Sequence, residues 1–367
     1  MPDPMDGTAI ILTNGLLTES AAKTAHGLIR GTLRYRILAV VDEAHAGMDA
    51  GVVLDGQNRR IPIMATVTEA IKKVTEPINY CLVGIAPKGG KLPGEMKSQI
   101  RECICNQIHI VSGLHDFISD MPEMLNLANQ YKVSITDIRK PKKREELHFW
   151  SGKIYNIRAL TIAVLGTDTC LGKRTTARFL TDACTVAGIR TGMISTGQTG
   201  WMQDGQYGFV LDTTINDFVS GELEHAIFTC DQETKPDLIV VEGQSGLRNP
   251  TGPCGSEFLL SGNIRHVILQ HAPKRKWYGE NQQWGEIPTL ASELALIRMY
   301  GARVEAVTLN TQGCTPLESG QFRSSYEKDL NIPVVLPLEE GVDRLVNLMK
   351  KLMEIQKQTI VNPGPGD

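Results

Sequence analysis

The sequence of 367 residues predicts an α/β protein, with a Rossmann-like N-terminal domain followed by a doubly wound parallel-sheet domain of the P-loop NTPase type. Three observations predict this class. The chain is longer than one hydrophobic core usually serves. Short β-rich runs alternate with helical patterns, which is typical of a parallel sheet covered by helices. The alternation restarts at Leu160, so we expect domains at 1–145 and 146–367.

In the N-terminal half, strands are expected at 8–13, 34–42, 80–86, 108–114 and 133–138, with helices near 19–31, 67–74, 94–106 and 120–130. The loop GIAPKGGKLP (84–93) follows one of these strands but lacks the G-x-G-x-x-G spacing. Asp42 is only a weak match to a ribose-binding acid. The pattern therefore does not favour a dinucleotide site in this half.

The basic segment RKPKKREELHFWSGK (139–153) joins the two halves. Charge runs of this kind are usually solvated, so one interpretation is an interdomain linker. The alternative is a basic lip over an anionic ligand.

In the C-terminal half, LTIAVLG (160–166) is an apolar run of the type that is buried on both faces of a sheet. Apolar residues at helical spacing over 173–187 predict a helix that Gly188 ends. Further strands are expected at 191–196, 237–243, 265–271, 304–310 and 332–338, and further helices near 214–229, 289–300 and 340–355.

The overall composition points to a small-molecule substrate. The net charge of −3 and the pI of about 6.3 give no reason to expect nucleic acid or a membrane surface as a partner. Eight cysteines without a C-x-x-C pair, an N-terminus unlike a signal peptide and the lack of a spanning apolar run predict a cytoplasmic protein. We expect a homo-oligomer and no resident metal.

The stretch GTDTCLGKR after the first C-terminal strand is close to a phosphate-binding loop. A strand, a glycine-rich turn and a helix start bring several backbone N–H groups to one point, which suits an anion with several oxygens. Two features differ from the common pattern. Five residues separate Gly166 from Gly172 instead of four, and Arg174 follows Lys173 where Ser or Thr normally binds magnesium.

Acidic residues accompany this loop. Asp168 lies inside it, and its alternatives are to cap the helix, to orient a second substrate or to reach a partner subunit. Glu242 ends the strand in DLIVVEGQSGL (237–247), and the carboxyl ends of parallel strands share one edge of a sheet. Glu242 is therefore a candidate to hold magnesium, to act as a base or to pair with Lys173.

Two more loops are expected at the same edge, because each follows a predicted strand. STGQTGWM (195–202) contains Gln198, and HAPKRKWYGE (271–280) contains Lys274 and Arg275. Arg248, in GLRNP, is suited to clamp a substrate carboxylate. Ordinary turns and solvated basic loops are the alternative for each.

GTDTCLGK and VVEGQSGL resemble the phosphate loop and the second acidic motif of dethiobiotin synthetase and related amide-forming ATPases, which share the five-residue spacing. Longer motifs resemble a different family of two-domain proteins, which includes D-glutamate N-acetyltransferases. These motifs are GKRTTARFL, STGQTGWM, DFVSGELE, VVEGQSGLRNP and LQHAPKRK in the C-terminal half, and KTAHGLIR, VVDEAHAGMDAG and IAPKGGKLP in the N-terminal half.

The second resemblance implies acetyl transfer from acetyl-CoA to the amine of D-glutamate or a similar amino acid. By position, we expect the loop Gly166, Thr167, Thr169, Gly172 and Lys173, assisted by Arg174 or Thr175, to hold the phosphates of coenzyme A. The expected catalytic residues are Lys173, Glu242 and Asp168. The expected substrate-binding residues are Gln198, Arg248, Lys274 and Arg275.

Two other functions stay open at this point. An ATP- and magnesium-dependent ligase or kinase of the dethiobiotin synthetase type would place Lys173 on the β- and γ-phosphates and Thr175 or Glu242 on the metal. A non-catalytic nucleotide-binding protein would use the same loop without chemistry.

Overall fold

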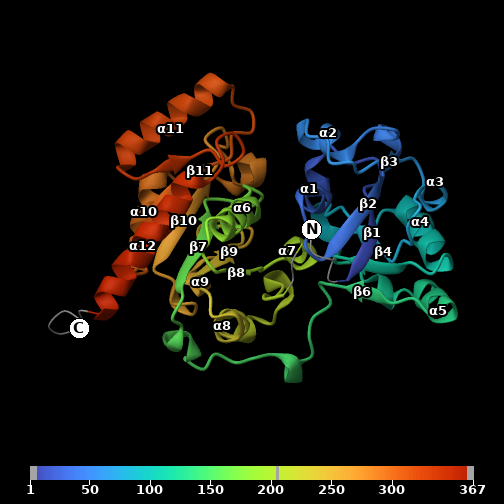
Figure 1. Ribbon diagram of the computed structural model, residues 1–367, viewed down its shortest axis with the longest axis horizontal. Helices are drawn as coiled ribbons and strands as arrows, with labels where there is room; N and C mark the ends of the chain where they lie inside the picture. Colours follow the sequence, from blue (N-terminus) through green and yellow to red (C-terminus); the bar gives the residue numbers. More distant parts are fainter. Residues whose placement is uncertain (1–5, 204–205, 362–367) are drawn as a thin grey trace. The chain divides into compact units, whose positions relative to one another are not determined.

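The computed structural model describes residues 6–203 and 206–361, and these residues form two compact units, each with its own parallel sheet (Figure 1). The N-terminal unit comprises residues up to 142 together with 197–206, and the C-terminal unit comprises 143–196 and the chain from 207 onward. Within the described ranges, no helix has both the length and the apolar character that crossing a bilayer requires.

The sheet of the N-terminal unit has the order β3-β2-β1-β4-β5-β6, with every pairing parallel. This is the strand order of a Rossmann-type fold. The elements of this unit are β1 (Gly7–Leu12), α1 (Lys23–Arg30), β2 (Tyr35–Val41), α2 (Ala50–Asp55), β3 (Ile63–Met64), α3 (Val67–Lys73), β4 (Tyr80–Val83), α4 (Gly94–Cys105), β5 (His109–Ser112), α5 (Pro122–Tyr131), β6 (Ile135–Asp137) and α7 (Gln198–Gln203).

The sheet of the C-terminal unit has the order β12-β11-β10-β7-β9-β8 and is again parallel throughout. Its elements are β7 (Leu160–Gly166), α6 (Lys173–Val186), β8 (Thr191–Ile194), α8 (Asn216–Thr234), β9 (Leu238–Glu242), α9 (Ser256–Leu260), β10 (His266–His271), α10 (Leu290–Met299), β11 (Arg303–Leu309), α11 (Pro316–Leu330), β12 (Val334–Val335) and α12 (Asp343–Val361). Both predicted parallel α/β sheets are therefore confirmed.

Strand β7 is buried on both faces of its sheet. Ile162 and Val164 pack in the cluster that α6 and α12 cover, whereas Ala163 and Leu165 pack in the cluster on the side of α8, α9 and α10. Successive side chains of a strand point to opposite faces, so a strand covered on both sides needs a continuous apolar run. The central position of β7 places the loop that follows it in the middle of one sheet edge.

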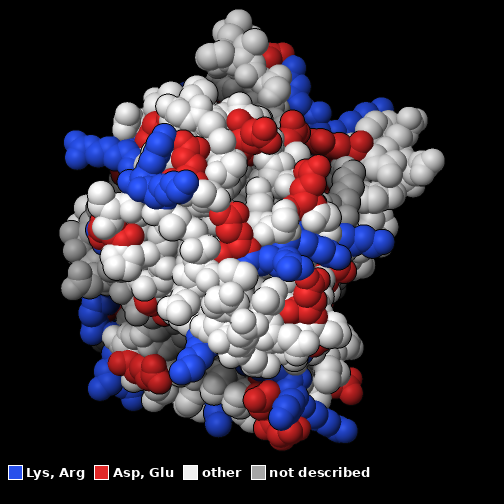
Figure 2. Space-filling model, turned by 90° about the vertical axis from the view of Figure 1, so that its right-hand side faces the viewer, with Lys and Arg blue, Asp and Glu red and all other residues white. Residues whose placement is uncertain are grey.

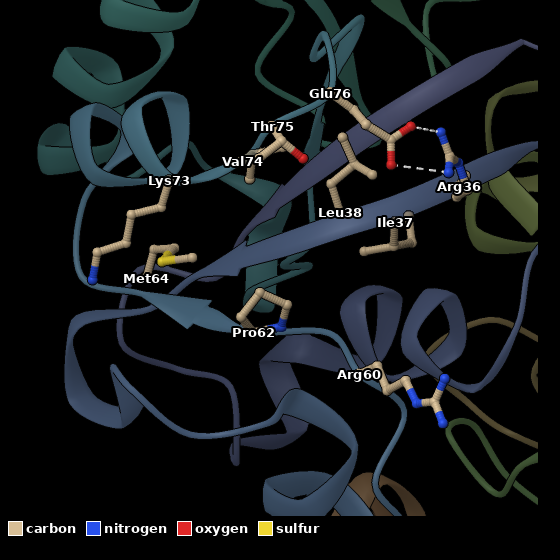
Figure 3. A pocket seen from close by; sticks show the side chains of 10 residues that line it. All are labelled: Arg36, Ile37, Leu38, Arg60, Pro62, Met64, Lys73, Val74, Thr75 and Glu76. Atoms are coloured by element: carbon tan, nitrogen blue, oxygen red, sulfur yellow. Dashed lines mark hydrogen bonds and ion pairs between the residues drawn. The ribbon is translucent and has the colours of Figure 1, made fainter.

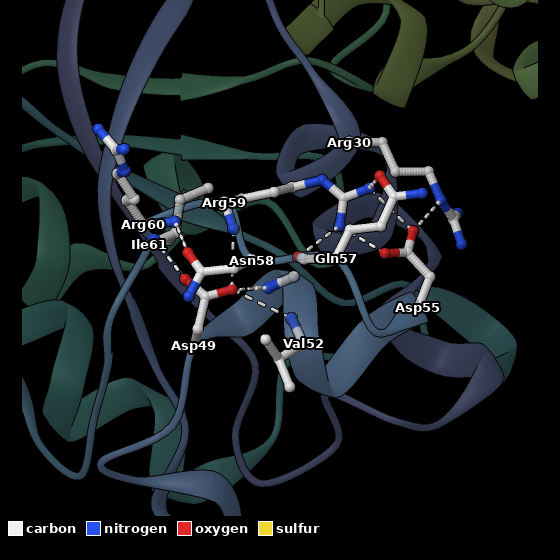
Figure 4. A network of polar contacts seen from close by, with 10 residues as sticks. Arg30, Asp49, Val52, Asp55, Gln57, Asn58, Arg59, Arg60 and Ile61 are labelled. Carbon is white, nitrogen blue, oxygen red and sulfur yellow. Dashed lines mark hydrogen bonds and ion pairs between the residues drawn. The ribbon is translucent and has the colours of Figure 1, made fainter.

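A hydrogen-bonded network around Asp49 begins α2 in the N-terminal unit (Figure 4). The Asp49 carboxylate accepts from the amides of Gly51, Val52, Arg59 and Ile61 at 2.8–3.0 Å. Burial alone would raise the pKa of Asp49, but these four amide hydrogen bonds lower it. The network includes further residues, which are Arg30, Asp55, Gln57, Asn58 and Arg60.

The basic segment at 139–153 is anchored at its C-terminal end and is not solvated throughout. The backbone amide of His148 donates to Glu222 of α8 at 2.9 Å, and that of Ser151 donates to Glu224 at 2.7 Å. Trp150 donates its indole N–H to the carbonyl of Ser261 at 3.0 Å. The segment is thus largely exposed, as the linker interpretation expects, but from His148 onward it is also hydrogen-bonded to α8.

Charged side chains of both signs lie interspersed with uncharged residues on the face drawn in Figure 2. This distribution agrees with the small net charge of the chain.

Candidate functional site

The loop between β7 and α6 has the form of a phosphate-binding turn. After Gly166 the chain bends over residues 167–172, with left-handed backbone angles at Cys170 (φ 53°) and Gly172 (φ 102°). Residues other than glycine rarely adopt the φ angle of Gly172. The helix then begins at Lys173, and the first-turn amides of a helix have no acceptor within it. The turn therefore presents backbone donors at the positive end of α6.

Lys173 is a buried cation within this loop. Its ammonium Nζ donates to the carbonyl oxygens of Asp168 at 2.6 Å and Ser245 at 2.7 Å, and the residue is 6% exposed. Burial lowers the pKa of Lys173 to about 8, and the nearby groups Cys170, Asp168, Cys254 and Glu242 oppose that shift. Among the described residues, the hydrogen bonds of Nζ go to these two neutral carbonyls, and the carboxylates of Asp168 and Glu242 act on it only through their charge, so a ligand anion would give the ammonium a direct counter-charge.

Close packing explains the glycine at the start of the loop. A side chain at Gly166 would press against Lys173, with Cδ at 3.0 Å and Nζ at 3.1 Å from its first carbon. Lys173 thus folds back across the end of β7. A side chain at position 166 would therefore push the Lys173 ammonium away from the centre of the turn.

Asp168 is enclosed by donors from two other loops. Its carboxylate accepts from Asn249 Nδ2 at 2.7 Å, from Arg275 at 3.0 Å and from the Gly279 amide at 2.8 Å, and the residue is fully buried. These donors follow β9 and β10 in the chain. Asp168 therefore joins both loops to the phosphate turn.

His271 at the end of β10 is a site residue that the sequence did not single out. Its Nδ1 lies 2.9 Å from the Thr167 hydroxyl, and its ring meets Tyr326 edge-on with centroids 5.9 Å apart. Burial first, and then the charge of Arg275, lowers the pKa of His271 to about 4. A neutral imidazole therefore supports the start of the phosphate loop near pH 7.

Gln270, next to His271, connects three elements. Its side-chain carbonyl accepts from the hydroxyls of Thr176 in α6 and Thr308 in β11, both at 2.6 Å. Its backbone carbonyl accepts from the amide of Thr167 at 3.1 Å. Apolar periodicity could not reveal this buried contact, because Gln270 lies within an otherwise apolar strand.

Glu242 lies where the sequence placed it, at the carboxyl end of β9, which pairs with β7. Its Oε2 accepts from the Thr196 amide at 3.3 Å, and Gln244 Nε2 approaches its Oε1 at 3.5 Å. Thr196 also donates its hydroxyl to the Glu242 backbone carbonyl at 2.7 Å. The negative charge of this carboxylate acts on Lys173, so both groups belong to one site.

The three cations expected to bind substrate all have protein partners. Arg248 donates its Nε to Glu293 at 2.6 Å and its NH2 to Ser292 at 2.8 Å. Burial raises the pKa of Glu293, against the opposing effect of Arg248. Lys274 forms an ion pair with Glu318. Arg248 and Lys274 are therefore each already paired with a carboxylate.

Arg275 contacts the phosphate loop itself. Its NH1 donates to Asp168 Oδ2 at 3.0 Å and to the Thr169 carbonyl at 2.7 Å, and its side chain is 9% exposed. Arg174 and Thr175 occupy the first turn of α6 and are half-buried. The structure thus brings the loop residues, Glu242 and Arg275 into one site.

Gln198 belongs to the N-terminal unit, whereas the phosphate loop belongs to the C-terminal unit. Its side-chain Nε2 donates to the hydroxyls of Thr24 and Thr199, and the residue is 3% exposed. Its position follows from the contacts of α7, which no sequence pattern predicted.

The N-terminal unit also has an open pocket of about 340 Å³ between β2 and the segment that follows α3 (Figure 3). Arg36 and Glu76 form an ion pair at its wall. None of the predicted site residues lines this pocket. The lining residues are Arg36, Ile37, Leu38, Arg60, Pro62, Met64, Lys73, Val74, Thr75 and Glu76.

The part of the chain that the structure describes contains no group of three or more His, Cys, Asp or Glu residues arranged to hold a metal ion.

Comparison with known proteins agrees with this architecture. Residues 148–346 match the P-loop domain of the DUF1611 family, a domain of unknown function, and residues 43–141 match its Rossmann-like N-terminal domain. A crystal structure of a DUF1611 family protein from Anabaena variabilis superimposes with a TM-score of 0.85 at 24% identity, covering 94% of this chain and 99% of that one.

Two relatives carry a functional name. A D-glutamate N-acetyltransferase from a Pseudoalteromonas species is 28% identical over 72% of this chain and 79% of its own length. A second D-glutamate N-acetyltransferase, from Tritonibacter scottomollicae, is 26% identical over 73% of this chain and 80% of its own. From the matched domains and the shared fold, the chain belongs to the DUF1611 family of two-domain proteins, with a Rossmann-like N-terminal domain and a P-loop C-terminal domain.

Proposed function

We propose that this protein is an N-acetyltransferase that moves an acetyl group from acetyl-CoA to the amine of D-glutamate or a similar amino acid. The observation that carries the proposal is the buried ammonium of Lys173, which two neutral carbonyls hold at the start of α6. The names of the two relatives supply the acyl donor class and the acceptor.

The phosphate turn suits the diphosphate of coenzyme A. The residues present fit such a group, because the backbone at the Gly172 bend is open to close approach, with no atom within 4 Å of the position of a side chain. Lys173 would place its charge on the phosphate oxygens, and the amides from Thr167 to Lys173 would donate to them. Arg174 stands where a metal-binding hydroxyl is common, which favours a ligand that binds without magnesium.

The chemistry requires an amine without its extra proton. The amine nitrogen attacks the thioester carbon, a C–N bond forms and the C–S bond breaks. The proton that the amine loses ends on the sulfur, so coenzyme A leaves as its thiol. Glu242 is the candidate to accept the amine proton or to orient the amine, because it is a carboxylate near Lys173. Its contacts with Thr196 and Gln244 would keep one orientation of the carboxylate.

The acceptor's carboxylates would use donors that the protein leaves available. Arg248 engages its partners through Nε and NH2, so we assign NH1 to an acceptor carboxylate. Arg275 and Lys274 are the further candidates, and both would have to share a donor with Asp168 or Glu318.

A second candidate is an ATP- and magnesium-dependent ligase or kinase. The position of Glu242 favours it, since a carboxylate at the end of the strand beside β7 is well placed to hold magnesium near a phosphate loop. Thr175 would then supply the hydroxyl. A non-catalytic nucleotide-binding role needs the same loop only.

One assay separates these functions. We would incubate the purified protein with acetyl-CoA and either D- or L-glutamate, or with ATP and magnesium, and follow free thiol, phosphate and product mass. We expect thiol release that depends on D-glutamate. Phosphate release from ATP without thiol release would exclude the transferase.

The matched variants are Lys173→Met and, as control, Lys328→Met on the exposed surface of α11. We expect the first to weaken coenzyme A binding at least tenfold, because a charge-assisted contact is lost. The control should bind like the unaltered protein. Equal binding by both variants would remove the loop from the proposal.

A further inference from the structure

Helix α7 follows β8 in the sequence, yet its contacts belong to the N-terminal unit. Met202 is fully buried in the core cluster of that unit, and Trp201 packs against the same cluster. The chain thus leaves the C-terminal unit after Thr196 to contribute one helix to the N-terminal core.

Polar contacts fasten α7 along α1. Gln203 donates its Nε2 to the carbonyls of Gly27 and Gly31, both at 2.8 Å. The amide of Leu33 donates to the Gln203 carbonyl at 2.8 Å. Arg34 stacks its guanidinium 3.6 Å from the centroid of the Trp201 ring. These contacts lie within the N-terminal unit and leave α7 little freedom.

Gln198 occupies the place where a doubly wound sheet usually receives its ligand. Thr24, its hydrogen-bonding partner, lies in the first turn of α1, and Gly113, which it contacts, follows β5 directly. A side chain at Gly113 would collide with Gln198 Oε1. Ligands of such sheets bind outside the carboxyl ends of the strands. Here a side chain of the protein itself lies at that edge.

The residue that precedes this segment contacts Glu242. The Thr196 amide donates to Glu242 Oε2 and its hydroxyl donates to the Glu242 carbonyl. One peptide bond joins Thr196 to Gly197, the first residue assigned to the N-terminal unit. A shift of the α7 start would therefore act, across one peptide bond, on the residue whose amide and hydroxyl contact Glu242.

We propose that α7 is a tether through which the N-terminal unit fixes the orientation of Glu242 beside the phosphate loop. Gln198, Gln203 and Arg34 are positioning residues in this scheme, and none of them has to touch substrate. The proposal rests on the proposed function only in treating Glu242 as a residue of the working site.

The test uses two glycine variants of the full chain. Gly113→Ala forces Gln198 away, whereas Gly94→Ala, at the start of α4 in the same unit, meets no atom within 4 Å. We would measure backbone hydrogen exchange without ligand. For Gly113→Ala we expect exchange of the Thr196 amide to rise roughly tenfold, because its hydrogen bond to Glu242 is weakened. Gly94→Ala should leave it unchanged.

A second variant guards against misfolding. Gln203→Leu removes the two hydrogen bonds to the carbonyls of Gly27 and Gly31 and replaces the amide by an apolar group of similar size, so it should raise the same exchange rate. We also expect a lower kcat at constant KM for acetyl-CoA in both variants. If α7 exchanges faster while Thr196 and the residues of β9 keep their protection, the tether is wrong. Without transferase activity in the unaltered protein, the exchange result still decides the tether, and only the proposed function fails.

Discussion

Lys173 holds a positive charge in a nearly closed environment, and this predicts a proton linkage. In the protein without ligand, the pKa of Lys173 is about 8. A phosphate beside the ammonium would favour its charged form and raise that pKa. Between the two pKa values, ligand binding therefore takes up a proton. We expect coenzyme A affinity to fall as the pH rises from 7 to 9.

Calorimetry in two buffers of different ionisation enthalpy at pH 8.5 measures this uptake directly. Lys173→Met should bind more weakly and lose the uptake, whereas Lys328→Met should keep it. Binding without proton uptake at pH 8.5 would show that the ammonium does not face the phosphates.

His271 predicts that the stability of the fold, too, depends on pH. Its folded-state pKa of about 4 is below the ordinary value of 6.5, so the unfolded chain binds more protons between these values. Stability is then full above pH 6.5 and is lost as the pH falls toward 4, by about 3 kcal/mol for a shift of this size. Urea unfolding at pH 4, 5, 6 and 7 measures the loss.

The control is the same series for His271→Gln, which keeps a polar group near Thr167. Its free energy of unfolding should vary less over this range, by about the same 3 kcal/mol. A parallel pH profile in both proteins would assign the acid sensitivity to carboxylates instead.

Among single residues, the sequence could predict the positions of those that lie at or just after the end of a strand. Lys173 and Glu242 are neighbours because their strands pair, and parallel strands present their carboxyl ends at one edge. The engagement of Asp168 with Arg275 could not be predicted, since it depends on how the loop after β10 folds back. Sequence order could not predict that α7, which contains Gln198, packs within the N-terminal unit, and the substrate-binding role of Gln198 stays a prediction.

At the scale of the elements, the segment around His148 packs against α8, and we expect this packing to outweigh helix propensity at one position of α8. Ala is favoured over Gly in a helix by about 1 kcal/mol. At Gly221 of α8, however, a side chain would collide with the backbone of His148 and Phe149. We expect Gly221→Ala to lower the free energy of unfolding by about 1 to 3 kcal/mol, as overpacking does.

Gly320 in α11 is the matched control, because nothing lies within 4 Å of its position. Gly320→Ala should stabilise the protein by roughly 0.5 to 1 kcal/mol. Chemical denaturation of both variants gives the comparison. Stabilisation by both substitutions would mean that the segment around His148 does not pack on α8.

The sequence predicted the long strands and most helices but missed α2, α7, α9 and α11. Helix α11 has fifteen residues, of which only Ser319 is buried, and its apolar side chains Phe322, Tyr326 and Leu330 are only partly buried, so its apolar pattern is weak. Its start was readable from Thr315, Pro316 and Glu318, which form a capping box with proline at the first position. Strand β3 was also missed, since its two residues are too few for a period to show, whereas β12 lies within the strand predicted at 332–338.

At the scale of the whole molecule, the two sheets have separate cores, and the sequence order of the chain does not coincide with its division into units. Periodicity showed that two α/β units exist, because each has its own run of strands. It could not show that residues 197–206 belong to the other unit. A helix of six residues is too short for its sequence to indicate which core it packs against.

This crossing gives the last prediction. Met202 and Met349 are both fully buried, the first in the N-terminal core and the second in the cluster beneath α12. Met→Ala in a core costs about 2 to 5 kcal/mol. Although both residues lie in the C-terminal half of the sequence, we expect Met202→Ala to accelerate hydrogen exchange in β1 and β4, and Met349→Ala to do so in β7 and β9. If Met202→Ala instead loosened β7 and β9 and spared β1, α7 would belong energetically to the P-loop unit despite its contacts, and the division of the molecule would follow the sequence after all.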